Sequence, residues 1–180
     1  IQGNGSSNQV RQGAGVITVG VAGRGLKDIS SATLGTLSGT VVTNNDKAAS
    51  LTFTIPSGAE VGPQTLKLET PLGTVEKEEA VVISKITVSN VGDDTAGKGT
   101  PDKPFKTMRF AIGQAASGDT VRLLDGTYNQ ASSETFPFTF PSSVTLTLEG
   151  ESETGTILEE TDGLDSDCLI ITDSEVTIST

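Results

Sequence analysis

The chain has 180 residues and a formal net charge of −11, with 34% hydrophobic and 4% aromatic residues and neither Trp nor His. Without His, catalytic pairs of serine or cysteine with histidine are excluded, and the acidic balance disfavours nucleic acid, whose phosphates it repels. The sequence contains no apolar run long enough to span a bilayer, and its one cysteine, Cys168, allows no intrachain disulfide.

The charge is concentrated in the second half of the chain. Residues 1–89 contain seven basic and seven acidic residues, whereas residues 90–180 contain five basic and sixteen acidic residues. No basic residue follows Arg122. Such a surface suits cations, high salt or a basic partner. The abundance of Gly, Ser and Thr is typical of short strands joined by many turns.

The first residues are polar and contain little to bury. We expect residues 1–12 to form a flexible arm or a donor segment. Strand patterns separated by turn residues follow over 16–26, 38–46, 49–58, 64–75 and 80–90. The clearest strand pattern is ASLTFTIPSG, in which Leu51, Phe53 and Ile55 alternate onto one face. Strands at this spacing predict a small β-sandwich over residues 13–86.

Three motifs in this region resemble the IPT/TIG branch of immunoglobulin-like domains. They are GRGL (23–26), LTFTIPSGAEVG (51–62) and TLKLETPLGT (65–74), and the resemblance extends over about residues 10–86. It implies an Ig-like sandwich. Members of that family usually open with a further strand that ends in Pro, and the polar arm stands in its place here. We therefore expect the domain to lack its first edge strand or to receive one from elsewhere.

A loop and a helix follow this region. Turn-forming residues dominate 91–103, which predicts a loop. Apolar residues then recur on one helical face, at Phe105, Met108, Ala111, Ile112 and Ala115. Pro104 suits a helix start, and Ser117-Gly118 is a helix-stop signal. The spacing predicts a helix near 104–117.

Short apolar β segments occupy the rest of the chain, at 120–124, 136–140, 144–148, 155–158, 168–171 and 175–178. The turns between them lack the Asn-Gly and Asp-Gly pairs of tight hairpins. A coil of parallel strands fits this pattern better, because each turn of such a coil stacks on the one before.

Residues 87–180 resemble the N-terminal end of right-handed parallel β-helix proteins, a group that includes pectate-lyase-like enzymes and domains of unknown activity. The matching residues are GDD (92–94), GT (99–100), PFKT (104–107), Ala111, Ala115, GDTV (118–121) and GTY (126–128). In that family the amphipathic helix caps the first coil, which stacked repeats require. The closing VTIST resembles the start of another rung, so we expect two or three coils. Either the chain is a fragment, or its open apolar edge recruits a partner.

One acidic loop is a candidate metal site. TDGLDSD (161–167) places Asp162, Asp165 and Asp167 in a loop with a glycine, and hard oxygen ligands on a flexible loop suit Ca²⁺. A solvated acidic loop is the alternative. The weaker candidates are Asp93, Asp94 and Asp102. For these three, turn formation and helix capping are the competing interpretation.

The pattern predicts an all-β protein, and the two resemblances imply that it is exported and consists of an Ig-like β-sandwich, then a short right-handed parallel β-helix with an N-terminal capping helix. We expect a non-catalytic structural subunit, at the cell surface or in an extracellular fibre, that forms a homo-oligomer or filament. In the sharper version, residues 1–12 or 169–180 of one subunit donate a strand to the next, head to tail.

The alternative is a carbohydrate-binding or adhesion module that binds a glycan and belongs to a larger surface protein or polysaccharide-active enzyme. A fragment of a polysaccharide lyase is a third hypothesis. Paired carboxylates can serve glycoside hydrolysis, but β-helix enzymes build their sites along longer stacks, and fold alone does not establish activity.

Overall fold

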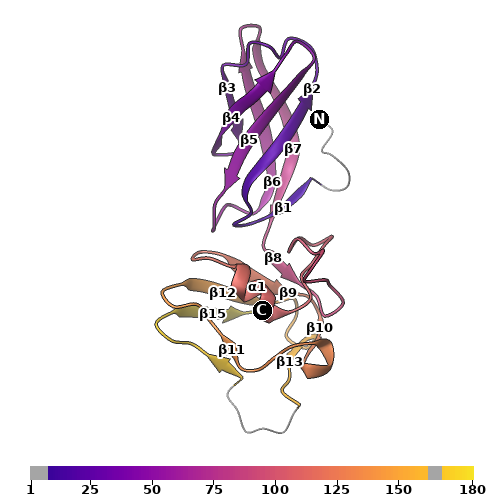
Figure 1. The fold of residues 1–180 in the computed structure, drawn as a ribbon, viewed down its shortest axis with the longest axis vertical. Coiled ribbons are helices and arrows are strands. Elements are labelled where there is room, and N and C mark those ends of the chain that lie inside the picture. The colour runs from indigo at the N-terminus through magenta and orange to yellow at the C-terminus, as the bar shows by residue number, and fades with distance from the viewer. Residues whose placement is uncertain (1–7, 162–167) are drawn as a thin grey trace. The chain divides into compact units, whose positions relative to one another are not determined.

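The computed structural model describes residues 8–161 and 168–180. This part of the chain is mostly β, as the composition predicted (Figure 1). Its contacts divide it into two compact units. The first unit comprises residues 1–10, 14–56 and 60–83, and the second comprises residues 11–13, 57–59 and 84–180.

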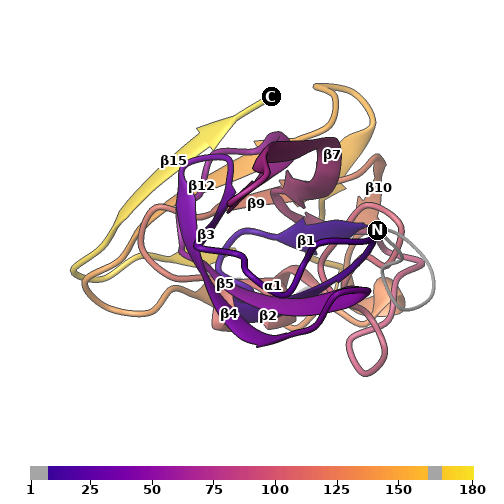
Figure 2. The ribbon, with the colours of Figure 1, turned by 90° about the horizontal axis from the view of Figure 1, so that it is seen from above.

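Across the described residues, the first unit is one curled sheet of seven strands in the order β1-β7-β6-β3-β4-β5-β2. The strands are β1 (Gln9–Arg11), β2 (Gly15–Ala22), β3 (Ser31–Leu34), β4 (Leu37–Asn44), β5 (Ala48–Ile55), β6 (Gly62–Thr70) and β7 (Gly73–Ser84). The pairings from β7 through to β2 are antiparallel. Figure 2 shows the sheet curling, with β4 and β2 along one side and β7 on the other.

Alternating side chains make the core of the first unit. Leu51, Phe53 and Ile55 in β5 are at most 1% exposed, which confirms the alternation predicted for this strand. A Cβ at Gly39 of β4 would overlap the Phe53 ring, so glycine at this position lets the ring lie directly against the strand.

Residues Gln9–Arg11 fall in the predicted flexible arm, yet they form β1 beside β7. The Val82 N–H donates to the Asn8 carbonyl at 2.9 Å, and the Asn8 side-chain amide donates to the Glu79 carbonyl at 2.7 Å. The expectation of a flexible arm therefore does not hold for these three residues. Main-chain hydrogen bonds hold them in place, and composition gives no signal for such bonds.

The second unit contains parallel strands stacked in layers. Its elements are β8 (Ile86–Val88), α1 (Met108–Gln114), β9 (Thr120–Leu123), β10 (Gly126–Tyr128), the short 3₁₀ helix η1 (Gln130–Ser132), β11 (Phe138–Thr139), β12 (Thr145–Gly150), β13 (Thr156–Leu158), β14 (Leu169–Ile170) and β15 (Glu175–Ser179). Parallel pairings join β8, β9, β12 and β15 in that order, and also β10 with β13 and β11 with β14. The prediction of parallel strands in place of hairpins is confirmed.

These pairings define three layers. The first layer contains β9, β10 and β11, the second contains β12, β13 and β14, and the third contains β15. β8 precedes the first layer and pairs with β9. Each strand of a layer therefore lies directly against the equivalent strand of the layer before it.

The helix α1 is shorter than the predicted 104–117. The Thr107 hydroxyl accepts the Phe110 N–H at 3.2 Å, so Thr107 is the N-cap and Pro104 lies in the preceding loop. The helix buries Met108, Ala111 and Ile112 and packs against β8 and β9. It therefore covers the apolar side of the first layer, as a cap would. Neither helical segment among the described residues is long and apolar enough to cross a membrane.

Two carboxylates hold the start of α1. Asp94 Oδ1 accepts the N–H groups of Lys106 and Thr107 at 2.7 and 3.1 Å, and Glu134 Oε1 accepts the Met108 N–H at 2.7 Å. Glu134 is 4% exposed, and its Oε2 has no hydrogen-bond partner. Burial raises the pKa of Glu134 above its ordinary value, although the backbone N–H groups act in the opposite direction.

We expect Glu134→Gln to change how stability depends on pH. A carboxyl with a raised folded-state pKa stabilises the fold below its unfolded pKa, and that contribution is lost as the pH rises through the folded value. Gln keeps an acceptor for the Met108 N–H and does not titrate. The Tm of the variant relative to the native protein should therefore rise as the pH increases above the ordinary pKa of a glutamate, about 4.3.

Thermal melts of both proteins over a series of pH values test the expectation. Glu153→Gln, at an exposed position of the same unit, is the matched control. If Glu134→Gln and Glu153→Gln follow the same pH dependence, the buried carboxyl does not carry the effect.

Candidate functional site

Side chains at equivalent positions of the stacked strands form continuous columns inside the second unit. One column runs through Ile86, Val121, Leu148 and Ile178, which are register partners in successive strands. The first three are 0%, 0% and 3% exposed, whereas Ile178 is 64% exposed. Each strand thus covers the side chain of the strand before it, and Ile178 is covered on one side.

Two further columns show the same increase in side-chain exposure toward the later strand. Tyr128 of β10 stacks on Leu158 of β13, and Phe138 of β11 stacks on Leu169 of β14. Tyr128 and Phe138 are fully buried, while Leu158 is 36% exposed and Leu169 is half-buried. Four inward side chains are the last of their columns among the described strands: Leu158 and Leu169 of the second layer, and Val176 and Ile178 of the third. We call these four side chains together the unstacked layer.

The buried phenol of Tyr128 has a structural role. Its hydroxyl lies 2.8 Å from the Leu124 carbonyl and 3.1 Å from the Val88 carbonyl, to which it donates. Burial is the main cause that raises the pKa of Tyr128. Because the ring is fully buried, it packs in the core of the second unit and offers no exposed face to a ligand.

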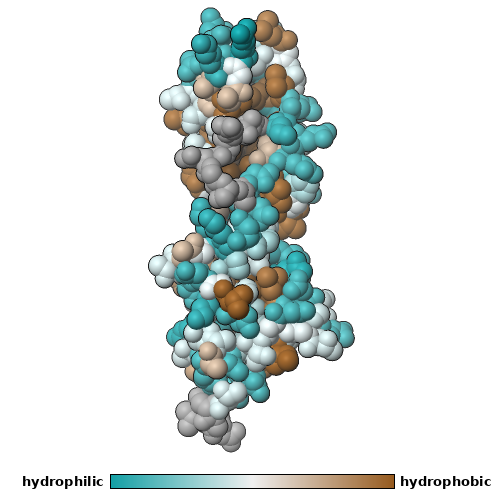
Figure 3. Space-filling model, turned by 90° about the vertical axis from the view of Figure 1, so that its right-hand side faces the viewer, coloured by the Kyte–Doolittle hydropathy of each residue, from teal (hydrophilic) through white to brown (hydrophobic). Residues whose placement is uncertain are grey.

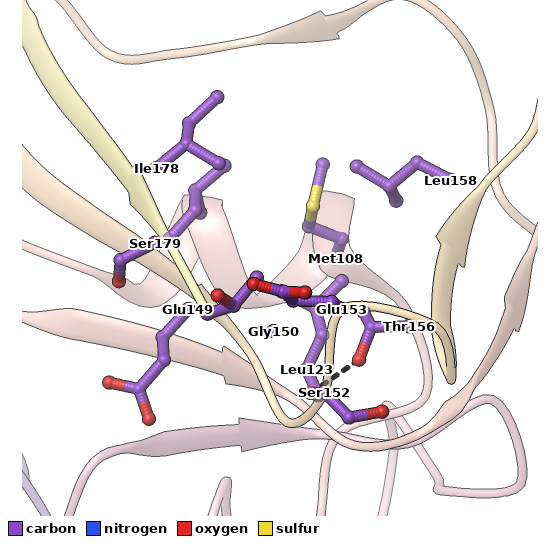
Figure 4. A pocket seen from close by; sticks show the side chains of 12 residues that line it. Met108, Leu123, Glu149, Gly150, Ser152, Glu153, Thr156, Leu158, Ile178 and Ser179 are labelled. Atoms are coloured by element: carbon purple, nitrogen blue, oxygen red, sulfur yellow. Dashed lines mark hydrogen bonds between the residues drawn. The ribbon is translucent and has the colours of Figure 1, made fainter.

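The unstacked layer borders a pocket of about 180 Å³ (Figure 4). Its apolar lining comes from the helix and from all three layers: Met108, Leu123, Leu148, Leu158 and Ile178. In Figure 4, Met108 lies between Ile178 and Leu158, and the carboxylate of Glu149 is directed away from these apolar side chains. An apolar cavity of about 150 Å³ holds a benzene-sized group, so the pocket can take one large aliphatic or aromatic side chain.

Acidic groups surround this apolar region. Glu149 forms an ion pair with Lys85, and its Oε1 lies 3.7 Å from Arg122 Nε. Arg122 Nη2 lies 3.2 Å from Glu151 Oε1. Such partly exposed pairs contribute about 0–1 kcal/mol each. The second unit contains seven basic and sixteen acidic residues, a formal net charge of −9. Two copies of this surface therefore repel each other at low ionic strength.

Exposed apolar residues also occur elsewhere on the protein. Figure 3 shows a face on which hydrophilic side chains (teal) predominate and hydrophobic ones (brown) form separate patches. In the second unit, Val91 is 87% exposed in the loop before α1. Single exposed apolar residues are normal on protein surfaces. The unstacked layer differs because its members are register partners of buried residues.

The weaker predicted metal ligands make contacts to backbone and hydroxyl groups. Asp93 Oδ1 accepts the N–H groups of Ala96 and Thr95 at 3.0 and 2.7 Å, and these bonds lower the pKa of Asp93. Asp94 holds the start of α1, and Asp102 accepts a threonine hydroxyl at 2.6 Å. Within 8–161 and 168–180, no group of three or more His, Cys, Asp or Glu side chains is placed to hold a metal ion.

Sequence reasoning missed two buried acids. Asp119 is 1% exposed and accepts the Ala116 N–H at 2.9 Å. The Ser-Gly-Asp-Thr run before β9 is a turn signal that could have identified it. Glu134 lies in the polar stretch before β11, and nothing in its neighbouring residues distinguishes it from a surface acid.

A match to a family model covers less than half of the chain. Residues 90–162 match a family model described as "Protein of unknown function (DUF1565)". This family is associated with proteins that resemble parallel β-helices. No match was found among curated proteins or among solved structures. The matched segment contains α1 and the strands from β9 to β13.

The stronger predicted metal ligands, Asp162, Asp165 and Asp167, lie outside the described residues. The Ca²⁺ site there stays a prediction. Titration with CaCl₂ should raise the Tm of the native protein, because a ligand that binds the folded chain stabilises it. Replacement of all three by Asn should abolish the rise. MgCl₂ at the same ionic strength is the control, and an unchanged melting temperature in CaCl₂ would contradict the site.

Proposed function

We propose that this chain is a non-catalytic structural module, and that its unstacked layer joins the equivalent layer of a second copy. In this proposal the second unit is a short right-handed parallel β-helix with α1 as its cap. The increase in exposure from 3% at Leu148 to 64% at Ile178 carries the proposal. The family match over residues 90–162 supports the β-helix part of it.

Apolar burial favours the association. Burying an isoleucine side chain contributes about 1.5–3 kcal/mol, and a symmetric β15–β15 contact buries Val176 and Ile178 in both copies. The outer edge of β15 also carries backbone groups that a further strand can bond. Each added hydrogen bond contributes about 0.5–1.5 kcal/mol.

Strand register allows this contact without exposing apolar groups. Val176 and Ile178 both belong to inward columns, since they partner the buried Leu146 and Leu148. An antiparallel β15–β15 pair centred on Thr177 places Val176 of one copy opposite Ile178 of the other. Both inward faces then meet across the two-fold axis.

The first unit fits an IPT/TIG immunoglobulin-like sandwich in this proposal. Its curled antiparallel sheet and the alternating core of β5 support that assignment, together with the three turn motifs. An extracellular or cell-surface location follows from the two family resemblances. Because Gln9–Arg11 occupy the edge beside β7 of their own sheet, completion at β15 is favoured over donation of these residues by the arm.

The carbohydrate-binding alternative needs a groove with polar groups and aromatic faces that stack on sugars. Apolar side chains converge on the pocket beside the unstacked layer, and three of them are Leu123, Leu148 and Ile178. This lining favours the packing of β structure.

Ile178→Asp should weaken self-association of the full chain. The change places a charge in the proposed contact twice, because each copy carries it. We expect the dissociation constant to rise by about tenfold or more, since about 1.4 kcal/mol corresponds to a factor of ten. Sedimentation velocity over a concentration series measures it.

Val91→Asp is the matched control, because it adds the same charge at an exposed valine of the same unit. Equal association of the two variants, or a native chain that stays monomeric at the highest concentration tested, would contradict this proposal.

Raising the ionic strength should strengthen self-association through the unstacked layer. Raising NaCl from about 0.01 M to about 1 M shortens the Debye length from about 30 Å to about 3 Å, which screens the repulsion between two acidic units. Apolar contacts persist under these conditions. We expect a smaller dissociation constant at high salt by the same sedimentation measurement. Association that weakens as salt is added would contradict an apolar contact between two acidic units.

A further inference from the structure

Strand β2 forms an edge of the sheet in the first unit. Among the described strands, its sheet partner is β5. Its eight residues, GVITVGVA, include no charged residue and no proline. The register with β5 runs from Gly15↔Ile55 to Ala22↔Ala48 without a bulge. The outer side of β2 is therefore a long, regular and uncharged row of backbone groups.

The opposite side of the same sheet is protected against pairing. Residues 73–79 of β7 are exposed, and four of them are charged: Glu76, Lys77, Glu78 and Glu79. Glu79 also has a φ of 50°, which interrupts the regular strand. Charged side chains and local irregularities are means by which proteins prevent edge-to-edge pairing. The sequence of β2 has no comparable charge, and its register has no comparable irregularity.

We propose that the outer edge of β2 pairs with β2 of a second copy, antiparallel about a two-fold axis. Val19 is buried, and Ile17 and Val21 are half-buried on the same face. In an antiparallel pair centred on Val19, Ile17 of one copy lies opposite Val21 of the other. The apolar faces then continue across the contact, and both edges gain hydrogen-bond partners at once.

The charge of the first unit suits a second copy as the occupant. This unit contains five basic and seven acidic residues, a formal net charge of −2, against −9 for the second unit. Two first units therefore repel each other weakly. A strand from another protein would have to place its apolar side chains on the same face of the sheet as Ile17, Val19 and Val21. A second copy of β2 does so because it has the same sequence.

This inference extends the proposed self-association but stands on other residues. The unstacked layer and the β2 edge would each form one two-fold contact per chain. A chain with two different two-fold contacts links copies into assemblies larger than a dimer, either a closed tetramer or an open series. With one contact alone, association stops at the dimer.

The test compares two double variants by sedimentation velocity. Val16→Lys with Thr18→Lys adds two charges at exposed positions of β2. Thr40→Lys with Val42→Lys adds the same charges to the same residue types at exposed positions of β4, which lies between β3 and β5. We expect the β2 variant to stop at the dimer, with a β2 dissociation constant raised by about tenfold or more. The β4 variant should assemble as the native chain does.

Adding Ile178→Asp separates the two surfaces. Ile178→Asp alone should leave dimers joined through β2, and its combination with the β2 variant should leave monomers. Equal assembly of the β2 and β4 variants would overturn this inference and leave the β15 contact standing. Loss of the β2 contact with no effect of Ile178→Asp would overturn the β15 contact instead.

Hydrogen exchange on the native chain provides a measurement that needs no variant. Protection of the backbone amides of residues 16–21 should increase with protein concentration. Protection that does not change over the concentrations at which the chain assembles would also overturn the β2 contact.

Discussion

Stacking of one strand on the next is the constraint on which the second unit depends. A strand of two to six residues cannot bury its own side chains, so its apolar positions become core only when an equivalent strand lies beside it. The column from Ile86 to Ile178 records this dependence as a change from complete burial to 64% exposure. Helix α1 solves the same problem on the first layer with Met108, Ala111 and Ile112. In the second unit, each layer therefore needs a neighbouring strand or helix to bury its apolar side chains.

Periodicity predicted most of this architecture from the sequence. The alternation of Leu51, Phe53 and Ile55, the parallel order of the later strands and the presence of a helix near 104–117 all follow from side-chain spacing. The start of the helix could not be placed, because Thr107 and Pro104 are both acceptable near a helix start and tertiary contacts from Asp94 and Glu134 decide between them.

Three strands escaped prediction for a different reason. β1 (QVR), β3 (SATL) and β10 (GTY) are short and have few apolar residues, and the main-chain bonds of their neighbours define them. A pattern of side chains gives no information about such bonds.

The candidate surfaces differ in how far the sequence reveals them. The apolar alternation of β15 can be predicted from VTIST. The free side of β2 cannot, because whether a strand lies at an edge depends on the order of strands in the sheet, which no local pattern encodes. The contrast between the charged β7 and the uncharged β2 acquires meaning only once that order is known.

The hydrogen bonds of the Tyr128 hydroxyl make the first layer of the stack harder to open than the last. By donating to the carbonyls of Val88 and Leu124, the hydroxyl ties the strand before the first layer to the corner after β9. By contrast, β15 has a neighbour in β12 alone among the described strands. Within the described residues, opening β15 therefore breaks fewer contacts than opening the layer that α1 and Tyr128 hold, which gives the two sides of the stack different local stability.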